Sequence, residues 1–239
     1  IEFIPYSEKW KGLYVLDAHD TSELSHVHIR GTDFLADGVL SLTGGATFYQ
    51  SDVNISHARF SKSHAEDMLN IVRSDYKILD TEFSESRSDA IDSDFSNGEI
   101  LSVGFRKVGG DGVDLSGSEL YAKDLTFDHI WDKAISVGEK SHFKGSTVTV
   151  KNSGSAIVSK DGSQSFVDNL SVEKSQGYIA ITYVKKPVYG AALLKIKNSN
   201  LKPRDVLNQS GNTLILEGQH ISAGQINVDA LYNSEQMKK

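Results

Sequence analysis

The chain has 239 residues, a formal net charge of −7 at neutral pH and no cysteine. The lack of cysteine excludes disulfides, thiolate metal sites and a cysteine nucleophile. The acidic balance and the absence of a basic stripe in the sequence argue against a nucleic-acid partner. No stretch approaches the roughly 20 apolar residues that a membrane helix needs, so we expect no membrane insertion.

The N-terminal part of the chain, 1–66, is less regular than the rest. The sequence starts with neither Met nor an apolar leader, so we expect it to be part of a longer multidomain protein. Two apolar stretches, 12–18 and 37–44, resemble the later repeat and precede it at spacings of 25 and 30. We predict that 1–66 forms irregular N-terminal coils.

A regular repeat organises the chain over about 67–198. Six aligned stretches start 22 apart, at Asp67, Asp89, Asp111, Lys133, Ser155 and Gly177. Their third positions are all aliphatic: Leu69, Ile91, Val113, Ile135, Ile157 and Ile179. Because the fifth positions are also apolar or Ser, the alternation predicts a short strand with one buried face. Turn residues then separate it from a second apolar stretch, so we expect two strands per repeat.

A unit this short cannot bury its apolar face alone, so neighbouring units must stack in register. Helical repeats would need 3.6-residue periodicity over ten or more residues, which the units do not show. The sequence therefore predicts an all-β fold, a single parallel β-solenoid of roughly nine coils over 1–239. Residues 199–239 contain a further alternating run, Ile226, Val228 and Leu231, and we predict a C-terminal coil and cap there.

Stacking places residues 22 apart on top of each other and so creates two polar ladders. The first contains Asp67, Asp89 and Asp111, and the second, expected to face outward, contains Asn70, Asp92, Asp114 and Ser136. Carboxylates about 5 Å apart repel unless donors or a cation offset the charge. Two interpretations stay open: aspartates that accept backbone N–H bonds at strand entrances, or a calcium site with Asp92, Asp94 and Asp114 as ligands.

Two lysines continue these ladders, Lys133 in the first and Lys160 beside the second. With Asp114 they are the candidate catalytic residues. Alternating charge along a ladder also relieves repulsion without any catalytic role.

Exposed aromatic and basic residues are the candidate carbohydrate contacts. Tyr121 and Trp131 fall in the coil that follows Asp111, and Lys185, Lys186 and Tyr189 fall in an insertion over 183–192. Insertions in solenoids often mark the working face.

The stretches "SDAIDSDFSNGEI", "GGDGVDLSGS", "DKAISVGEKS" and "YVKKPVYGAA" resemble coils of the bacterial right-handed parallel β-helix repeat proteins of the pectate-lyase-like superfamily. The resemblance covers almost the whole chain. It is strongest to a subset that is often attached to kinase-like domains of the spore-coat H type. It implies right-handed winding, a location outside the cytoplasm (extracellular, cell-surface or periplasmic), and carbohydrate as the usual ligand class.

Within this superfamily, "GGDGVDLS" is similar to a coil of the polygalacturonase-type hydrolases. Asp132 matches the first of their paired aspartates, but Lys133 stands where the second belongs. Because glycoside hydrolysis needs both carboxylates, we expect a non-catalytic module that binds polysaccharide or serves as a surface scaffold. The alternative is a calcium-dependent polysaccharide lyase or uronate epimerase, since lyases of this fold use a basic residue beside calcium to act on an acidic glycan.

Overall fold

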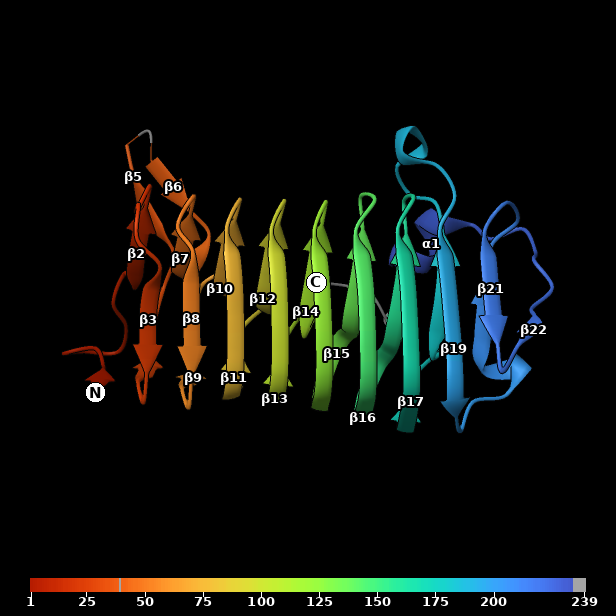
Figure 1. The fold of residues 1–239 in the computed structure, drawn as a ribbon, viewed down its shortest axis with the longest axis horizontal. Coiled ribbons are helices and arrows are strands. Elements are labelled where there is room, and N and C mark those ends of the chain that lie inside the picture. Colours follow the sequence, from red (N-terminus) through yellow and green to blue (C-terminus); the bar gives the residue numbers. More distant parts are fainter. Residues whose placement is uncertain (39, 234–239) are drawn as a thin grey trace.

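The chain winds into a parallel β-solenoid of about ten turns with a repeat near 22 residues, which confirms the predicted fold class. The computed structural model describes residues 1–38 and 40–233. Figure 1 shows the turns stacked side by side along the long axis, in sequence order from the N-terminal to the C-terminal end. Among the described residues, no helix is long and apolar enough to cross a membrane.

The turns differ in how continuous their strands are. The N-terminal turns use short strands: β1 (Glu2–Phe3), β2 (Leu13–Leu16), β3 (Ser22–Ser25), β4 (His28–Arg30), β7 (Gly44–Tyr49), β8 (Val53–Ser56) and β9 (Arg59–Ser61). The central turns combine strands of 4 to 6 residues with strands of 12 to 20: β10 (Asp67–Val72), β11 (Asp75–Ser86), β12 (Asp89–Asp94), β13 (Asn97–Val108), β14 (Val113–Ser116), β15 (Glu119–Gly138), β16 (His142–Lys160) and β17 (Gln164–Ser175). The C-terminal part holds β18 (Ala180–Tyr183), η1 (Pro187–Tyr189), β19 (Leu193–Ser199), η2 (Pro203–Asp205), β20 (Val206–Asn208), β21 (Thr213–Leu216), β22 (Gln219–His220) and α1 (Val228–Asn233).

Each central turn has three faces. Face A contains 75–79 and its register partners 97–101, 119–123, 142–146, 164–168 and 193–197. Face B contains 81–86 and its partners 103–108, 125–130, 148–153 and 170–175. Face C contains 89–94 and its partners 67–72, 113–116, 135–138 and 157–160.

The repeats that begin at Asp67 and Asp89 have two strands each, as predicted, but the second strand covers two faces. Faces A and B belong to one long strand that bends at a single residue in the left-handed conformation: Asp80, Ser102, Asp124, Thr147 or Asn169, with φ between 45° and 56°. Left-handed backbone is unfavourable for residues other than glycine by roughly 1–2 kcal/mol. Asp and Asn tolerate this conformation better than other residues, but a single one without a neighbouring Gly or Pro is too weak a turn signal to mark these corners in the sequence.

The core lies inside the three faces. The predicted aliphatic positions pair in register from Leu69 through Ile91, Val113 and Ile135 to Ile157, and all are buried. On face B, four phenylalanines stack along the axis with ring centroids 4.9, 5.4 and 4.6 Å apart: Phe60, Phe83, Phe105 and Phe127. These stacked rings and aliphatic columns supply the apolar burial that a single repeat lacks.

The predicted register is wrong for the last aligned stretch. Ile157 pairs with Ala180 instead of Ile179, so one residue is added at this turn. The backbone N–H groups of Ala156 and Ile157 both donate to the Ile179 carbonyl, as in a bulge. Ile181 therefore leaves the inward row and pairs with Val158 in the outward row of face C.

The N-terminal stretch 37–44 is also not a coil strand. Its residues form most of a separate antiparallel hairpin, β5 (Leu35–Asp37) with β6 (Leu40–Leu42), which projects from the rod in Figure 1. The strand that stacks on β10 is β7, where Ala46 pairs with Leu69. The alternating residues of a short hairpin and of a solenoid strand have the same periodicity, so the sequence pattern did not separate them.

The C-terminal end closes in two ways. The strand β22 pairs antiparallel with β21 and covers the last edge of face A. Of the alternating run Ile226, Val228 and Leu231, the last two lie in the helix α1. They pack on Val158, Ile181 and Tyr183. Thus α1 covers the apolar part of face C, behind the strands in Figure 1.

Candidate functional site

The aspartates at the entrance of face C are buried and accept backbone hydrogen bonds. Asp89 Oδ1 accepts the Asp111 N–H at 2.8 Å, and Asp111 Oδ1 accepts the Lys133 N–H at 3.0 Å. Asp67, Asp89 and Asp111 are at most 3% exposed. Of the two interpretations of this ladder, the geometry favours aspartates that cap the strand of the next turn.

The ammonium of Lys133 continues the ladder and supplies positive charge to it. Its Nζ lies 3.0 Å from Asp111 Oδ1 and also bonds Asp132 Oδ2, and all three side chains are at most 3% exposed. Burial disfavours the charged lysine, but Asp111 and Asp132 outweigh this effect and raise its pKa. Burial raises the pKa of Asp111 to about 8, against the lowering effect of Lys133. One ammonium between two carboxyls is consistent with one carboxyl holding a proton at neutral pH.

The predicted calcium ligands are only partly brought together. Asp114 lies with Asp89 and Asp111, and one oxygen from each lies within 4.8 Å of the others, a grouping that could hold a metal ion. Asp92 and Asp94 are outside this group. Oxygen ligands suit Ca²⁺, but Asp89 and Asp111 already accept N–H bonds, and Lys133 Nζ lies against Asp111. The residues as arranged do not fit a calcium site without displacing that ammonium.

Asp92 and Asp94 belong to the outward row and its edge. Burial and then the nearby Asp67 raise the pKa of Asp92 well above its ordinary range, and burial and Asp114 raise the pKa of Asp94. Asn70 Nδ2 donates to Asp92 Oδ2 at 3.3 Å. The crowding of acids on this face is therefore relieved by amide donors and lysines, and the raised pKa values of Asp92 and Asp94 favour their protonated forms.

Lys160 is the second lysine of this face. Its Nζ donates to Ser136 Oγ at 2.9 Å and lies 3.9 Å from Asp114 Oδ1, and the residue is 8% exposed. The structure thus brings Lys133, Lys160 and Asp114 to one region of face C. Since Lys133 is 2% exposed, a polymer on the surface has no access to its ammonium.

The insertion after β18 is hydrogen-bonded to residues that follow the strands of face C. Asp161 Oδ1 accepts the N–H groups of Lys185 and Lys186, each at 2.6 Å. The Lys186 ammonium pairs with Glu139, and this hydrogen bond raises the pKa of the lysine. Lys185 is exposed and Tyr189 half-buried. At least Lys186 therefore has a structural partner.

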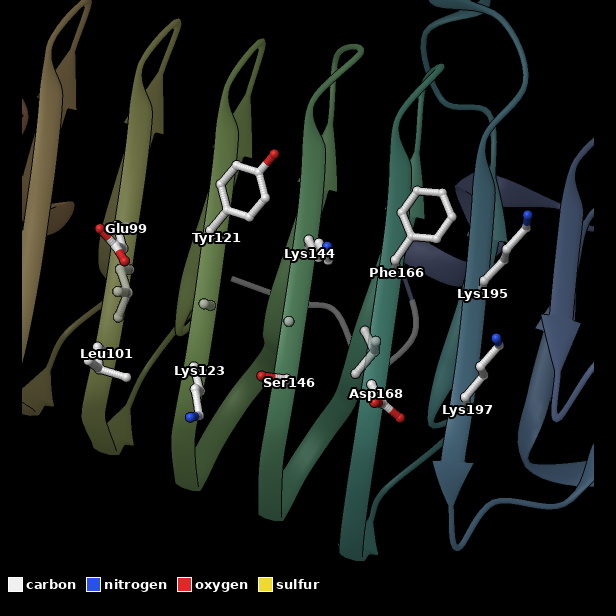
Figure 2. A pocket seen from close by; sticks show the side chains of 14 residues that line it. Glu99, Leu101, Tyr121, Lys123, Lys144, Ser146, Phe166, Asp168, Lys195 and Lys197 are labelled. Carbon is white, nitrogen blue, oxygen red and sulfur yellow. The ribbon is translucent and has the colours of Figure 1, made fainter.

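A groove on face A was not predicted from the sequence. It crosses five turns, from β13 to β19, and encloses about 680 Å³. Its outward side chains form two rows in register: Glu99, Tyr121, Lys144, Phe166 and Lys195, and then Leu101, Lys123, Ser146, Asp168 and Lys197. Figure 2 shows the Tyr121 and Phe166 rings in front of the sheet, with Lys144 between them.

The two rings are accessible platforms. Tyr121 is 58% exposed and Phe166 is 38% exposed, although large aromatic side chains are usually buried. They lie two turns apart, which is roughly 10 Å at the spacing of neighbouring strands. That separation is comparable to the length of a disaccharide.

The two acids of the groove have close hydrogen-bonding or ion-pair partners, whereas its lysines have no carboxylate partner in the described part of the chain. Glu99 pairs with Lys77 at 3.8 Å, and Asp168 accepts a hydrogen bond from Asn198 Nδ2 at 2.7 Å. Over 1–38 and 40–233, no carboxylate lies within 4.0 Å of the ammonium groups of the four groove lysines, Lys123, Lys144, Lys195 and Lys197. Lys195 Nζ lies 5.4 Å from the centroid of the Phe166 ring.

The two predicted aromatic contacts lie apart. Tyr121 is on face A in the groove, whereas Trp131 follows face B at the turn toward face C and does not line the groove. Both belong to β15, but that strand passes along all three faces. Phe166 and the groove lysines were missed because each is ordinary on its own, and the signal is their shared register.

No protein-family model matches the sequence, and no curated protein matches it significantly. Among solved structures, the chain is similar to the catalytic domain of a GH87 alpha-1,3-glucanase in complex with nigerose. The TM-score is 0.43 and the identity 12%, over 85% of this chain and 55% of that one. The chain therefore spans about half the length of that structure.

Proposed function

We propose that this chain is a non-catalytic module that binds a polysaccharide along the groove of face A. The observation that carries the proposal is the pair of exposed rings, Tyr121 and Phe166, two turns apart in one groove. Sugar rings stack on aromatic faces, and polar groups beside the rings fix their orientation. A polymer lying along the rod axis contacts both platforms.

The absence of catalysis is supported by two observations. Glu99 and Asp168 are three turns apart, roughly 14 Å, whereas an inverting pair of carboxyl groups is separated by about 6.5–9.5 Å. On face C, the candidate basic residue Lys133 is enclosed by Asp111 and Asp132. We also propose a location outside the cytoplasm, where such polymers are encountered, and a place within a longer multidomain protein.

Affinity electrophoresis in gels that contain neutral or acidic polysaccharides tests the proposal. The double substitution Tyr121→Ala with Phe166→Ala should lower the affinity obtained from the gel retardation about tenfold. Each stacked ring contributes roughly 0.5–1.5 kcal/mol beyond its buried area. Trp131→Ala is the matched control, since Trp131 is 54% exposed but outside the groove. Absence of retardation by every polysaccharide, or an equal loss with Trp131→Ala, contradicts the proposal.

The same polysaccharides test for the alternative activity. Incubation with calcium should release neither unsaturated uronates nor new reducing ends, and the uronate composition should stay unchanged. Formation of any such product that is lost in Lys160→Ala, with unchanged thermal melting, would support the lyase or epimerase instead.

A further inference from the structure

We infer that the polysaccharide bound along face A is acidic, with carboxylate or sulfate groups that the groove lysines contact. This inference rests on the proposed function and names the ligand class. Four ammonium groups line the groove: Lys123, Lys144, Lys195 and Lys197.

The charge of the groove is opposite to that of the chain. Four lysines and two acids give the groove a formal charge of +2, while the whole chain carries −7. Glu99 and Asp168 have partners outside the groove, Lys77 and Asn198. Four like charges in one concave surface repel, and an anionic ligand relieves this repulsion.

The lysines are placed next to the two aromatic platforms. Lys144 lies one turn from both rings, between them in the same row, and Lys195 lies one turn beyond Phe166. Lys123 is two residues after Tyr121 on the same strand and faces the same way. A sugar stacked on either ring therefore has an ammonium group at its edge, where a carboxylate or sulfate substituent projects.

A single-stranded nucleic acid is the other polyanion that stacks on aromatic rings. Its affinity depends on many phosphate contacts along an extended basic surface. Here the groove offers four ammonium groups and a formal charge of only +2, which is little for a polymer that carries a phosphate on every nucleotide. The observations thus favour an acidic glycan.

Titration calorimetry with paired probes tests the inference. One pair is polygalacturonate and its methyl ester, and the other is dextran sulfate and dextran. Within each pair the backbone is the same and the charge differs. At least one acidic probe should bind about tenfold or more tightly than its neutral partner, which is one 1.4 kcal/mol step in affinity. Preference for polygalacturonate identifies the anion as a carboxylate, and preference for dextran sulfate identifies it as a sulfate.

Substitutions connect the charge effect to the groove. Lys195→Glu with Lys197→Glu should weaken binding of the preferred acidic probe about tenfold or more, whereas Lys195→Arg with Lys197→Arg should retain it. Lys151→Glu is the matched control, because Lys151 is an exposed lysine on face B. Raising the salt from about 0.05 M to about 0.5 M should weaken the acidic probe selectively. Unchanged thermal melting shows that the variants fold.

Each other outcome overturns the inference in a recognisable way. Equal affinity for charged and neutral probes, with loss in the Tyr121→Ala and Phe166→Ala variant, removes the acidic ligand but keeps polysaccharide binding. Binding to none of the probes or polysaccharides removes both. Tighter binding to oligodeoxythymidine than to any glycan, lost in the Lys195→Glu and Lys197→Glu variant, assigns the groove to nucleic acid instead.

Discussion

At the scale of single residues, Lys133 supplies positive charge to the buried carboxyl groups of face C. Its ammonium lies between Asp111 and Asp132. A lysine at this place supplies the positive charge that a fourth carboxylate in the ladder would need from a bound cation. This single residue therefore balances charge in the interior of face C.

Replacing Lys133 should strongly destabilise the fold. Lys133→Met leaves buried carboxyl groups without their cation, and breaking a buried ion pair costs about 3–5 kcal/mol. Urea unfolding followed by circular dichroism measures the change. The double substitution Asp132→Asn with Lys133→Met should recover part of the loss, whereas Lys151→Met on the surface should change stability by less than about 0.5 kcal/mol. Equal effects at the two lysines would show that the buried pair contributes little.

The buried aspartates should make the protein less stable as the pH rises. The pKa of Asp111 is raised from 3.8 to about 8 by burial, and that of Asp92 is raised in the same direction by burial and Asp67. Across this window the native state binds more protons than the unfolded chain, so the free energy of unfolding falls as the pH rises. We expect a fall of at least about 1.4 kcal/mol, the equivalent of one pKa unit.

Urea unfolding at a series of pH values between 3.8 and about 8 checks this slope. Asp111→Asn should flatten the profile because it removes the titrating group. A stability that rises with pH across the same window would mean that the carboxylates are ionised and fully compensated.

At the scale of strands and turns, the phenylalanine stack on face B is the most regular packing element. Phe105 lies between two neighbours, with ring centroids 5.4 Å and 4.6 Å away, and is 2% exposed. Each ring fills the space between adjacent turns, so the stack couples the turns to one another.

Truncating the middle of this stack should cost more than reshaping it. Phe105→Ala should destabilise the protein by about 3–5 kcal/mol because it leaves a cavity between two rings. Phe105→Leu should cost clearly less, roughly 1–2 kcal/mol, since most of the volume stays filled. Denaturant unfolding of both variants gives the comparison. If both cost under about 1 kcal/mol, the turns do not depend on this stack.

The sequence predicted the strand pattern well where successive turns have the same number of residues. Leu69, Ile91 and Val113 fall in register because successive turns there keep the same length. The prediction was wrong at Ile179, where a one-residue bulge has no residue signature, and at 37–44, where a hairpin shares the strand alternation.

The site was harder to predict than the strands. That aspartates cap strand entrances followed from residue type, as Asp89 and Asp111 illustrate. The groove required knowing which side chains of distant turns share a row and which corner separates Tyr121 from Trp131. Corners such as Asp124, which carry neither Gly nor Pro, hide that geometry in the sequence.

At the scale of the whole molecule, the regular turns are interchangeable units. Asp75 and Asn97 are register partners, so removing 75–96 joins Ser74 to Asn97 without shifting any later row. The removed turn lies outside the stretch from Glu99 to Lys197 that lines the groove.

Deleting 75–96 should therefore give a shorter folded rod that still binds polysaccharide. In repeat proteins each unit contacts mainly its neighbours, so stability should decrease without loss of the fold. Circular dichroism and affinity electrophoresis check the β-structure and the binding, which we expect to change less than about twofold, well under a 1.4 kcal/mol step. Aggregation, or loss of binding by a well-folded variant, would show that distant turns act together.

The direction of the backbone hydrogen bonds determines how the rod responds to a pulling force. Neighbouring turns are joined by parallel ladders, so these bonds run along the axis from one turn to the next. A tensile force applied to the two ends loads them along their own direction, and the outermost turn carries the load first. Each turn that detaches releases about 22 residues, roughly 70 Å of extended chain. Under a pulling force the molecule would then lengthen in steps of one turn.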